Sequence, residues 1–119
     1  QYLLNLLTND ILNLYVTHLD AGNSKNDIEV RKSQLVSLTN NINNIKNPNI
    51  LELGVENGRS TKKFLELCNI NDGHLYSVDI EDCSKVASDK RWTFLKCRDD
   101  NFEYIKSKIP NKIDVIYID

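Results

Sequence analysis

The sequence predicts an α/β fold in which helices precede a parallel sheet. From residue 50 onwards, short apolar runs alternate with segments of helical spacing, as in crossover units between parallel strands. Before residue 47, apolar residues recur at helical spacing only. The length of 119 residues suggests one domain. We therefore expect an N-terminal helical segment over residues 1–47 and an α/β unit over residues 48–119.

The N-terminal segment is expected to be helical on both sides of one turn. Leucine and isoleucine side chains fall at helical spacing in residues 2–19, and residues 20–27 have the composition of a turn. A further helix is expected over residues 28–45, and Pro48 disfavours helical backbone just beyond it. We expect these helices to cover a ligand cleft or to form the contact of a homodimer.

Strands and helices alternate in the second segment. Strands are expected over residues 50–53, 74–80, 92–97 and 113–119, a turn over 70–73, and helices over 60–68, 83–90 and 99–109. Right-handed crossovers make 3-2-1-4 the expected strand order. The last strand would then be an apolar edge, and such edges are normally covered. We therefore expect the chain to be the N-terminal half of a longer protein whose missing part holds most of an acceptor pocket.

Composition argues against several classes of function. The formal net charge of -2 is unlike the basic footprint of an electrostatic nucleic-acid binder. No apolar run is long enough for a membrane span. The three cysteines have no Cys-x-x-Cys spacing, which disfavours a zinc site or a disulfide scaffold. Reduced thiols and a cytoplasmic protein fit this pattern better.

The stretch "NILELGVENGRST" (residues 49–61) holds two of the four glycines. Gly54 follows the first expected strand, at the sheet edge where parallel α/β folds bind ligands. Glycine permits a tight turn and close approach of the backbone to a ligand. Gly58 then leads into a helix whose N-terminal amides would favour an anionic group. A tight turn without a ligand is the alternative interpretation of the same pattern.

Asp79 ends the second expected strand, about twenty residues after this turn, where an acidic side chain can bind both hydroxyls of a ribose. A dinucleotide fingerprint needs glycines where this chain has Glu56 and Arg59. The acidic residues Glu52 and Glu56 disfavour a diphosphate. They suit S-adenosylmethionine (SAM), whose ammonium group Glu52 could bind directly or through water while backbone amides near Gly54 and Gly58 bind its carboxylate.

Together, "ILELGVENGRST", "LYSVDI", "CRDD" and "IDVIYID" resemble the class I SAM-dependent methyltransferases over residues 28–119. The form Glu-x-Gly-x-x-x-Gly-x-Ser-Thr is most similar to the branch that methylates oxygen on small molecules. The resemblance implies a Rossmann-like three-layer sandwich. It also implies a set of residues at the methionine end of the cofactor, namely Glu52, Gly54, Gly58 and Ser60.

The resemblance further implies that Asp79 binds the ribose, that Ile80 lies against the adenine and that Asp99 lies near the adenine amino group. The chain departs from the branch in two places. Glu56 replaces a glycine within the loop, and Arg98 stands where that branch often has glycine. The second departure leaves Asp100 as the alternative to Asp99.

Asp119 ends the last expected strand, beside the cofactor loop. In the resembling O-methyltransferases, this aspartate binds a divalent metal or positions the acceptor hydroxyl. Asp119 is therefore the expected catalytic residue and the tentative ligand of Mg²⁺ or another divalent cation, which would lower the pKa of the hydroxyl. An isolated strand-end carboxylate is the alternative.

Three other functions stay open. A nucleic-acid amino-methyltransferase would need a Pro-Pro-Tyr-like motif after Asp119. An NAD-dependent oxidoreductase is disfavoured by the loop. A non-catalytic half-domain would bind no cofactor. The expected function is methyl transfer from SAM to oxygen on a small-molecule acceptor, without nucleic-acid or membrane partners.

Overall fold

The computed structural model describes residues 36–118. The helices expected over residues 2–19, the proposed dimer contact through them, and Asp119 lie outside these residues. Of the helix expected over 28–45, the described part runs over residues 36–42. The helix ends earlier than expected because the chain tightens there: the N–H of Ile45 donates to the carbonyl of Ile42 at 2.8 Å.

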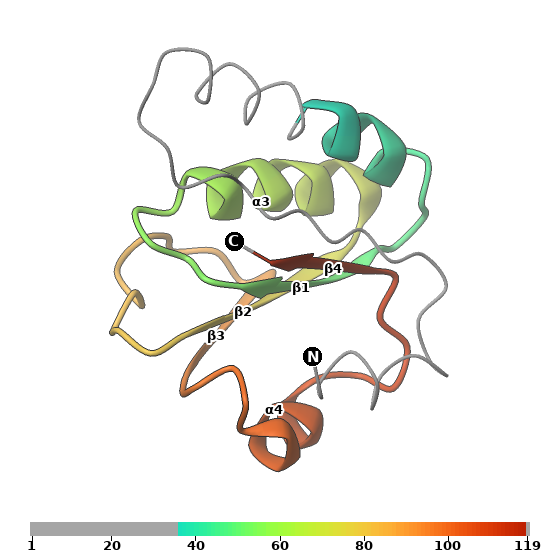
Figure 1. Ribbon diagram of the computed structural model, residues 1–119. Coiled ribbons are helices and arrows are strands. Elements are labelled where there is room, and N and C mark those ends of the chain that lie inside the picture. The colour runs from blue at the N-terminus through green and yellow to red at the C-terminus, as the bar shows by residue number, and fades with distance from the viewer. Residues whose placement is uncertain (1–35, 119) are drawn as a thin grey trace.

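Four parallel strands form one sheet in the order β3-β2-β1-β4, which confirms the expected Rossmann-like α/β fold (Figure 1). The strands are β1 (Asn49–Leu53), β2 (His74–Asp79), β3 (Trp92–Lys96) and β4 (Val115–Ile118). The strand order reverses between β1 and β4. All four strands point the same way, so their carboxyl ends meet at one edge of the sheet.

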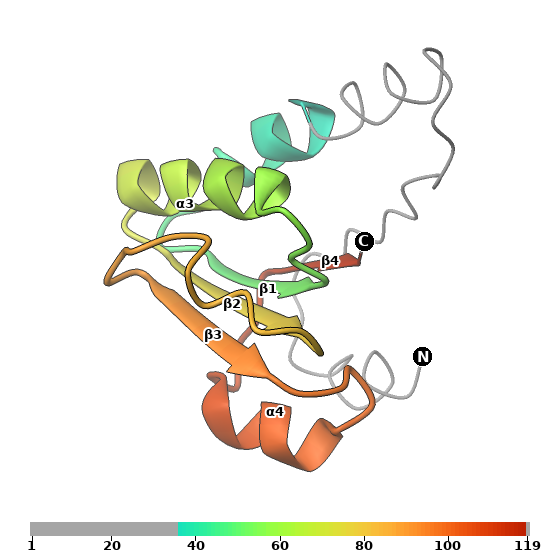
Figure 2. The ribbon, with the colours of Figure 1, turned by 90° about the vertical axis from the view of Figure 1, so that its left-hand side faces the viewer.

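Helices α3 (Arg59–Asn71) and α4 (Phe102–Lys108) lie on opposite faces of the sheet (Figures 1 and 2). The side-chain alternation of each strand supplies both cores. Ile50 of β1 packs in the α3 core with Phe64, whereas Leu51 packs in the α4 core with Ile105, and all four are fully buried. This arrangement is the three-layer sandwich.

Helix α3 extends further than expected and takes up half of the expected turn over 70–73. It ends where Asp72 adopts a left-handed conformation (φ 58°) and the N–H of Gly73 donates to the carbonyl of Cys68 at 2.8 Å. These two residues close the helix in the manner of a common C-terminal cap. Helix α4 in turn begins at Phe102, three residues later than expected, because Asp99 and Asp100 form a turn.

The helix expected over residues 83–90 is absent: that segment consists of turns and irregular backbone. Aspartate side chains support local turns there, since the Asp82 carboxylate accepts from both the N–H and the hydroxyl of Ser84 (3.1 and 2.6 Å). Such local bonds compete with helical hydrogen bonding.

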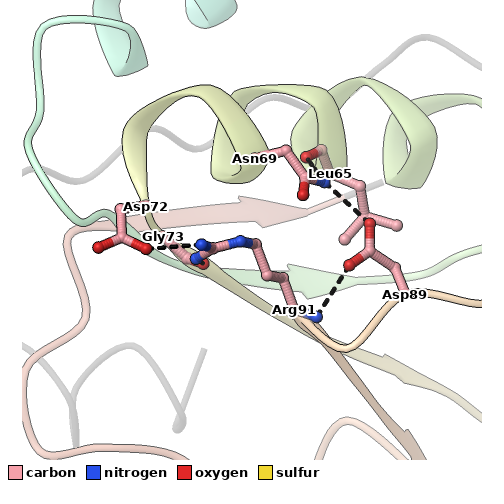
Figure 3. Close-up of polar contacts among 6 residues, drawn as sticks. All are labelled: Leu65, Asn69, Asp72, Gly73, Asp89 and Arg91. Carbon is pink, nitrogen blue, oxygen red and sulfur yellow. Dashed lines mark hydrogen bonds and ion pairs between the residues drawn. The ribbon is translucent and has the colours of Figure 1, made fainter.

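The end of this connection is fastened to α3 (Figure 3). Asn69 donates to the Asp89 carboxylate at 2.9 Å, and Asp89 also accepts the N–H of Arg91 at 2.9 Å. The Arg91 guanidinium reaches the end of α3, where it binds the carbonyl of Gly73 at 3.0 Å and the carboxylate of Asp72 at 2.6 Å. These side-chain hydrogen bonds therefore hold the β2–β3 connection against α3, although the connection contains no helix.

In the described part of the chain, no helix has both the length and the apolar character that a membrane crossing requires.

Candidate functional site

A cavity of about 470 Å³ opens at the carboxyl ends of the strands. Its volume lies within the usual range for small-molecule sites. It lies beside the reversal of strand order, where open α/β sheets bind their ligands. The residues that line it come from the ends of all four strands: Leu53, Gly54, Val78, Asp79, Ile80, Cys97, Arg98, Asp99 and Ile118.

Four of the residues expected at a ligand site line this cavity, namely Gly54, Asp79, Ile80 and Asp99. Ile80 is 61% exposed, so its apolar side chain is accessible to a ligand. Three other expected residues, Glu52, Gly58 and Ser60, are not among the lining residues. The side chains of Arg98 and Cys97, which were not expected to bind a ligand, do line it.

Asp79 fastens the loop that follows β1. One carboxylate oxygen accepts the N–H groups of Val55 and Glu56 at 2.8 and 3.2 Å, and the other accepts the N–H of Glu81 at 3.0 Å. Burial pushes the pKa of Asp79 upward, but these backbone donors and the Cys83 thiol hold the pKa below its ordinary value. A carboxylate accepts about four hydrogen bonds, so about one position is left for a ligand.

Four of the five amides of the glycine loop, residues 54–58, donate within the protein. Besides the two that Asp79 binds, Gly54 donates to the carbonyl of Val78 at 2.8 Å and Gly58 to that of Val55 at 2.9 Å. The next amide, of Arg59, donates to the Asn57 side chain at 3.3 Å. In this conformation, these amides do not serve the carboxylate of a ligand, as the sequence suggested, and they do not form a diphosphate cradle.

Gly58 is required by backbone conformation and by packing. Its φ of 83° is in the left-handed region, and a Cβ at this position would clash with Cγ1 of Val86. Val86 belongs to the β2–β3 connection, so this connection packs directly onto the glycine loop. Residue types along the chain carry no signal of this long-range contact.

Glu52 points away from the cavity, into the α3 core, where it is fully buried. Its carboxylate accepts hydrogen bonds from three hydroxyls: Ser60 at 2.5 Å, Thr61 at 2.7 Å and Ser77 at 2.7 Å. Direct contact with a ligand's ammonium, as expected from the sequence, does not occur with this geometry. Ser60 is likewise committed to Glu52. Both residues hold the first turn of α3 against the sheet.

Strand register explains why Glu52 is internal. Glu52 pairs with Ser77 across β1 and β2, so two polar side chains meet on the same face of the sheet. Ser77 also accepts the indole N–H of Trp92 at 2.9 Å, which continues the network to β3. The alternation of side chains along β1 was a signal in the sequence that Glu52 shares the face of Ile50.

The three cysteines are free thiols. Burial raises the pKa of Cys68 to about 12, and burial also raises the pKa values of Cys83 and Cys97, with nearby carboxylates adding to the effect. Because a nucleophilic cysteine needs a lowered pKa, none of the three is suited to covalent catalysis.

Within residues 36–118, no cluster of three or more histidine, cysteine, aspartate or glutamate side chains could hold a metal ion. The tentative metal ligand, Asp119, lies outside these residues, so its role stays a prediction.

The chain matches no known family model, no curated protein sequence and no solved structure.

Proposed function

We propose that the protein binds SAM and transfers its methyl group to oxygen on a small molecule. One observation carries this proposal: Gly54, Asp79, Ile80 and Asp99 line a single cavity where the strand order reverses. The cavity thus offers a carboxylate for a ribose, an exposed apolar side chain for a base and a second carboxylate for an amino group on that base. These three features together suit an adenosine.

The charge of the cavity favours SAM over a dinucleotide. Asp79 and Asp99 are acidic, and Arg98, the one cation among the described lining residues, is paired with Asp100 through two bonds of 3.2 and 3.1 Å. Four amides of the glycine loop, those of residues 54, 55, 56 and 58, donate to protein acceptors and are not free to bind a diphosphate. A ligand with a sulfonium and an ammonium group fits this environment better than two phosphates do.

In the proposed reaction, SAM supplies a methyl group on a positively charged sulfur. The acceptor oxygen attacks this methyl group in line, the carbon–sulfur bond breaks, and the acceptor proton leaves to a base. Asp79, Ile80 and Asp99 bind and orient the cofactor, and such positioning is a main source of rate. Asp119 is the expected base or acceptor-positioning group, from its place at the end of the last strand.

One observation favours a second candidate, a non-catalytic domain. Asp79 and Glu52 both accept hydrogen bonds from three donors of the protein itself. Carboxylates satisfied in this way can serve the fold alone. The two candidates differ in one property, because a purely structural role for these residues predicts no affinity for SAM.

Methyl transfer by the full-length protein from isotopically labelled SAM to a panel of phenols, sugars and other hydroxyl compounds tests the proposal. We expect label in at least one acceptor, and we expect Asp99→Asn to raise the KM for SAM. Glu66→Gln is the matched control, since Glu66 is an exposed residue of α3. Binding of SAM without transfer to any acceptor would reject the enzymatic part. An absence of binding would reject the whole proposal.

A further inference from the structure

Arg98 and Ile80 are two exposed side chains at the ends of neighbouring strands. Ile80 follows β2 and Arg98 comes two residues after β3, and both line the cavity. The N–H of Cys97 donates to the carbonyl of Asp79 at 3.0 Å, which keeps the two strand ends adjacent beyond the sheet. Ile80 is 61% exposed and the Arg98 side chain 71% exposed. Ile80 and Arg98 therefore both line the cavity where β2 and β3 end.

The Arg98 guanidinium is oriented by its own loop. Its Nε and one terminal nitrogen donate to the two carboxylate oxygens of Asp100, at 3.2 and 3.1 Å. Two parallel bonds fix the plane of a guanidinium as one bond cannot. The same pairing offsets the positive charge, so Arg98 offers a flat surface with little excess charge to attract a phosphate.

We infer that Arg98 is a specificity residue, which stacks on the base of a nucleoside ligand opposite Ile80, and that Asp100 holds it in the stacking orientation. Arginine is suited to this role because its planar group stacks on aromatic faces, whereas the lysine ammonium does not. The pair with Asp100 gives a preference for an uncharged nucleoside over its phosphate. This inference rests on the proposed function, because it assigns the base of the same ligand.

Titration calorimetry with adenosine and with adenosine 5′-monophosphate tests the inference on wild type, Arg98→Ala, Arg98→Lys and Asp100→Asn. Both ends of the ion pair are more than half exposed, so its removal should leave the fold intact. We expect Arg98→Ala to bind adenosine about twofold to fivefold more weakly, as for an exposed cation–π contact. Arg98→Lys should recover only part of this loss, and Arg59→Ala, a change outside the cavity, should bind as wild type does.

Asp100→Asn separates stacking from charge. It leaves the guanidinium unpaired, so the ratio of monophosphate to adenosine affinity should rise. Wild-type adenosine affinity in both Arg98 variants would overturn the inference, and so would an unchanged ratio in Asp100→Asn. If the wild type binds neither adenosine nor SAM, the proposed function and this inference both fail. If it binds SAM and the variants behave as wild type does, this inference alone fails.

Discussion

Replacing Asp79 should loosen the glycine loop before it affects any chemistry. The carboxylate accepts three backbone N–H groups, from Val55, Glu56 and Glu81. Each hydrogen bond to a charged group contributes about 1.5–3 kcal/mol, and the half-buried site lets water replace part of this. We therefore expect Asp79→Ala to lower the free energy of unfolding by about 2–4 kcal/mol. Asp79→Asn keeps one acceptor oxygen and should lose about 1–2 kcal/mol.

The effect should depend on pH in a defined direction. The pKa of Asp79 in the folded protein lies below its ordinary value of 3.8, so its stabilisation is present above that value and is lost as the pH falls through the folded-state pKa. Asparagine does not titrate. The difference in unfolding free energy between wild type and Asp79→Asn should therefore shrink from about pH 5 downwards.

Urea unfolding of both variants over this pH range is the assay. Asp99→Asn is the control, because Asp99 lines the same cavity but has no part in fastening the loop. It should leave the unfolding midpoint unchanged and weaken SAM binding. If Asp79→Asn unfolds at the wild-type midpoint, or if the difference from wild type is constant with pH, the fastening role is refuted.

Three further predictions follow from other contacts. Glu52→Gln should lower the free energy of unfolding by about 1–3 kcal/mol, because an amide group replaces one of the oxygens that accept buried hydroxyls. The control variant Glu66→Gln changes an exposed residue and should unfold as the wild type does. Equal urea midpoints for Glu52→Gln and the wild type would contradict the hydrogen-bond network. Gly58→Ala should destabilise the protein by about 1–3 kcal/mol, because residue 58 has a positive φ and the added Cβ would clash with Val86. The double variant Gly58→Ala/Val86→Ala should recover part of this loss. Thermal melts in which the double variant is no more stable than Gly58→Ala would reject the clash. Asp119→Asn should reduce turnover about a hundredfold or more with little change in SAM affinity, and steady-state kinetics with an intact rate would reject its catalytic role.

The sheet could be predicted from the sequence because its signals are local. Buried parallel strands read as short apolar runs, such as residues 50–53 and 115–118, and the crossover rule then leaves few strand orders. The segment over 83–90 was misassigned as a helix. Its conformation depends on Asp82, which binds Ser84, and on Arg91, which binds the end of α3. Contacts such as that of Arg91 with the end of α3 join residues that are distant in the sequence, so they leave no periodic pattern in it.

The part of the candidate site that could be predicted consists of residues at strand ends, because parallel strands bring their carboxyl ends to one edge of the sheet. Gly54, Asp79 and Asp99 meet because each follows or ends a parallel strand. The alternation along β1 puts Glu52 on the α3 face, and the expected contact between Glu52 and a ligand's ammonium did not take this alternation into account. The way Asp79 binds the loop amides depends on backbone geometry, for which residue types alone give no signal.

The distinction between Glu52 and Asp79 matters for function. Glu52 stabilises the first turn of α3 from within the core, whereas Asp79 faces both the loop and the cavity. The earlier expectation of two ribose bonds at Asp79 becomes an expectation of about one, since three positions are occupied by backbone donors. Any cofactor that forms two bonds there must release a loop amide.

The central claim, that this cavity binds SAM, is tested most directly by titration calorimetry of the wild-type protein with SAM, S-adenosylhomocysteine and NAD. The acidic lining and the internally bonded loop amides predict that both sulfur-containing ligands bind and that NAD binds more weakly or not at all. Tighter binding of NAD, or no heat with any of the three ligands, would contradict the account.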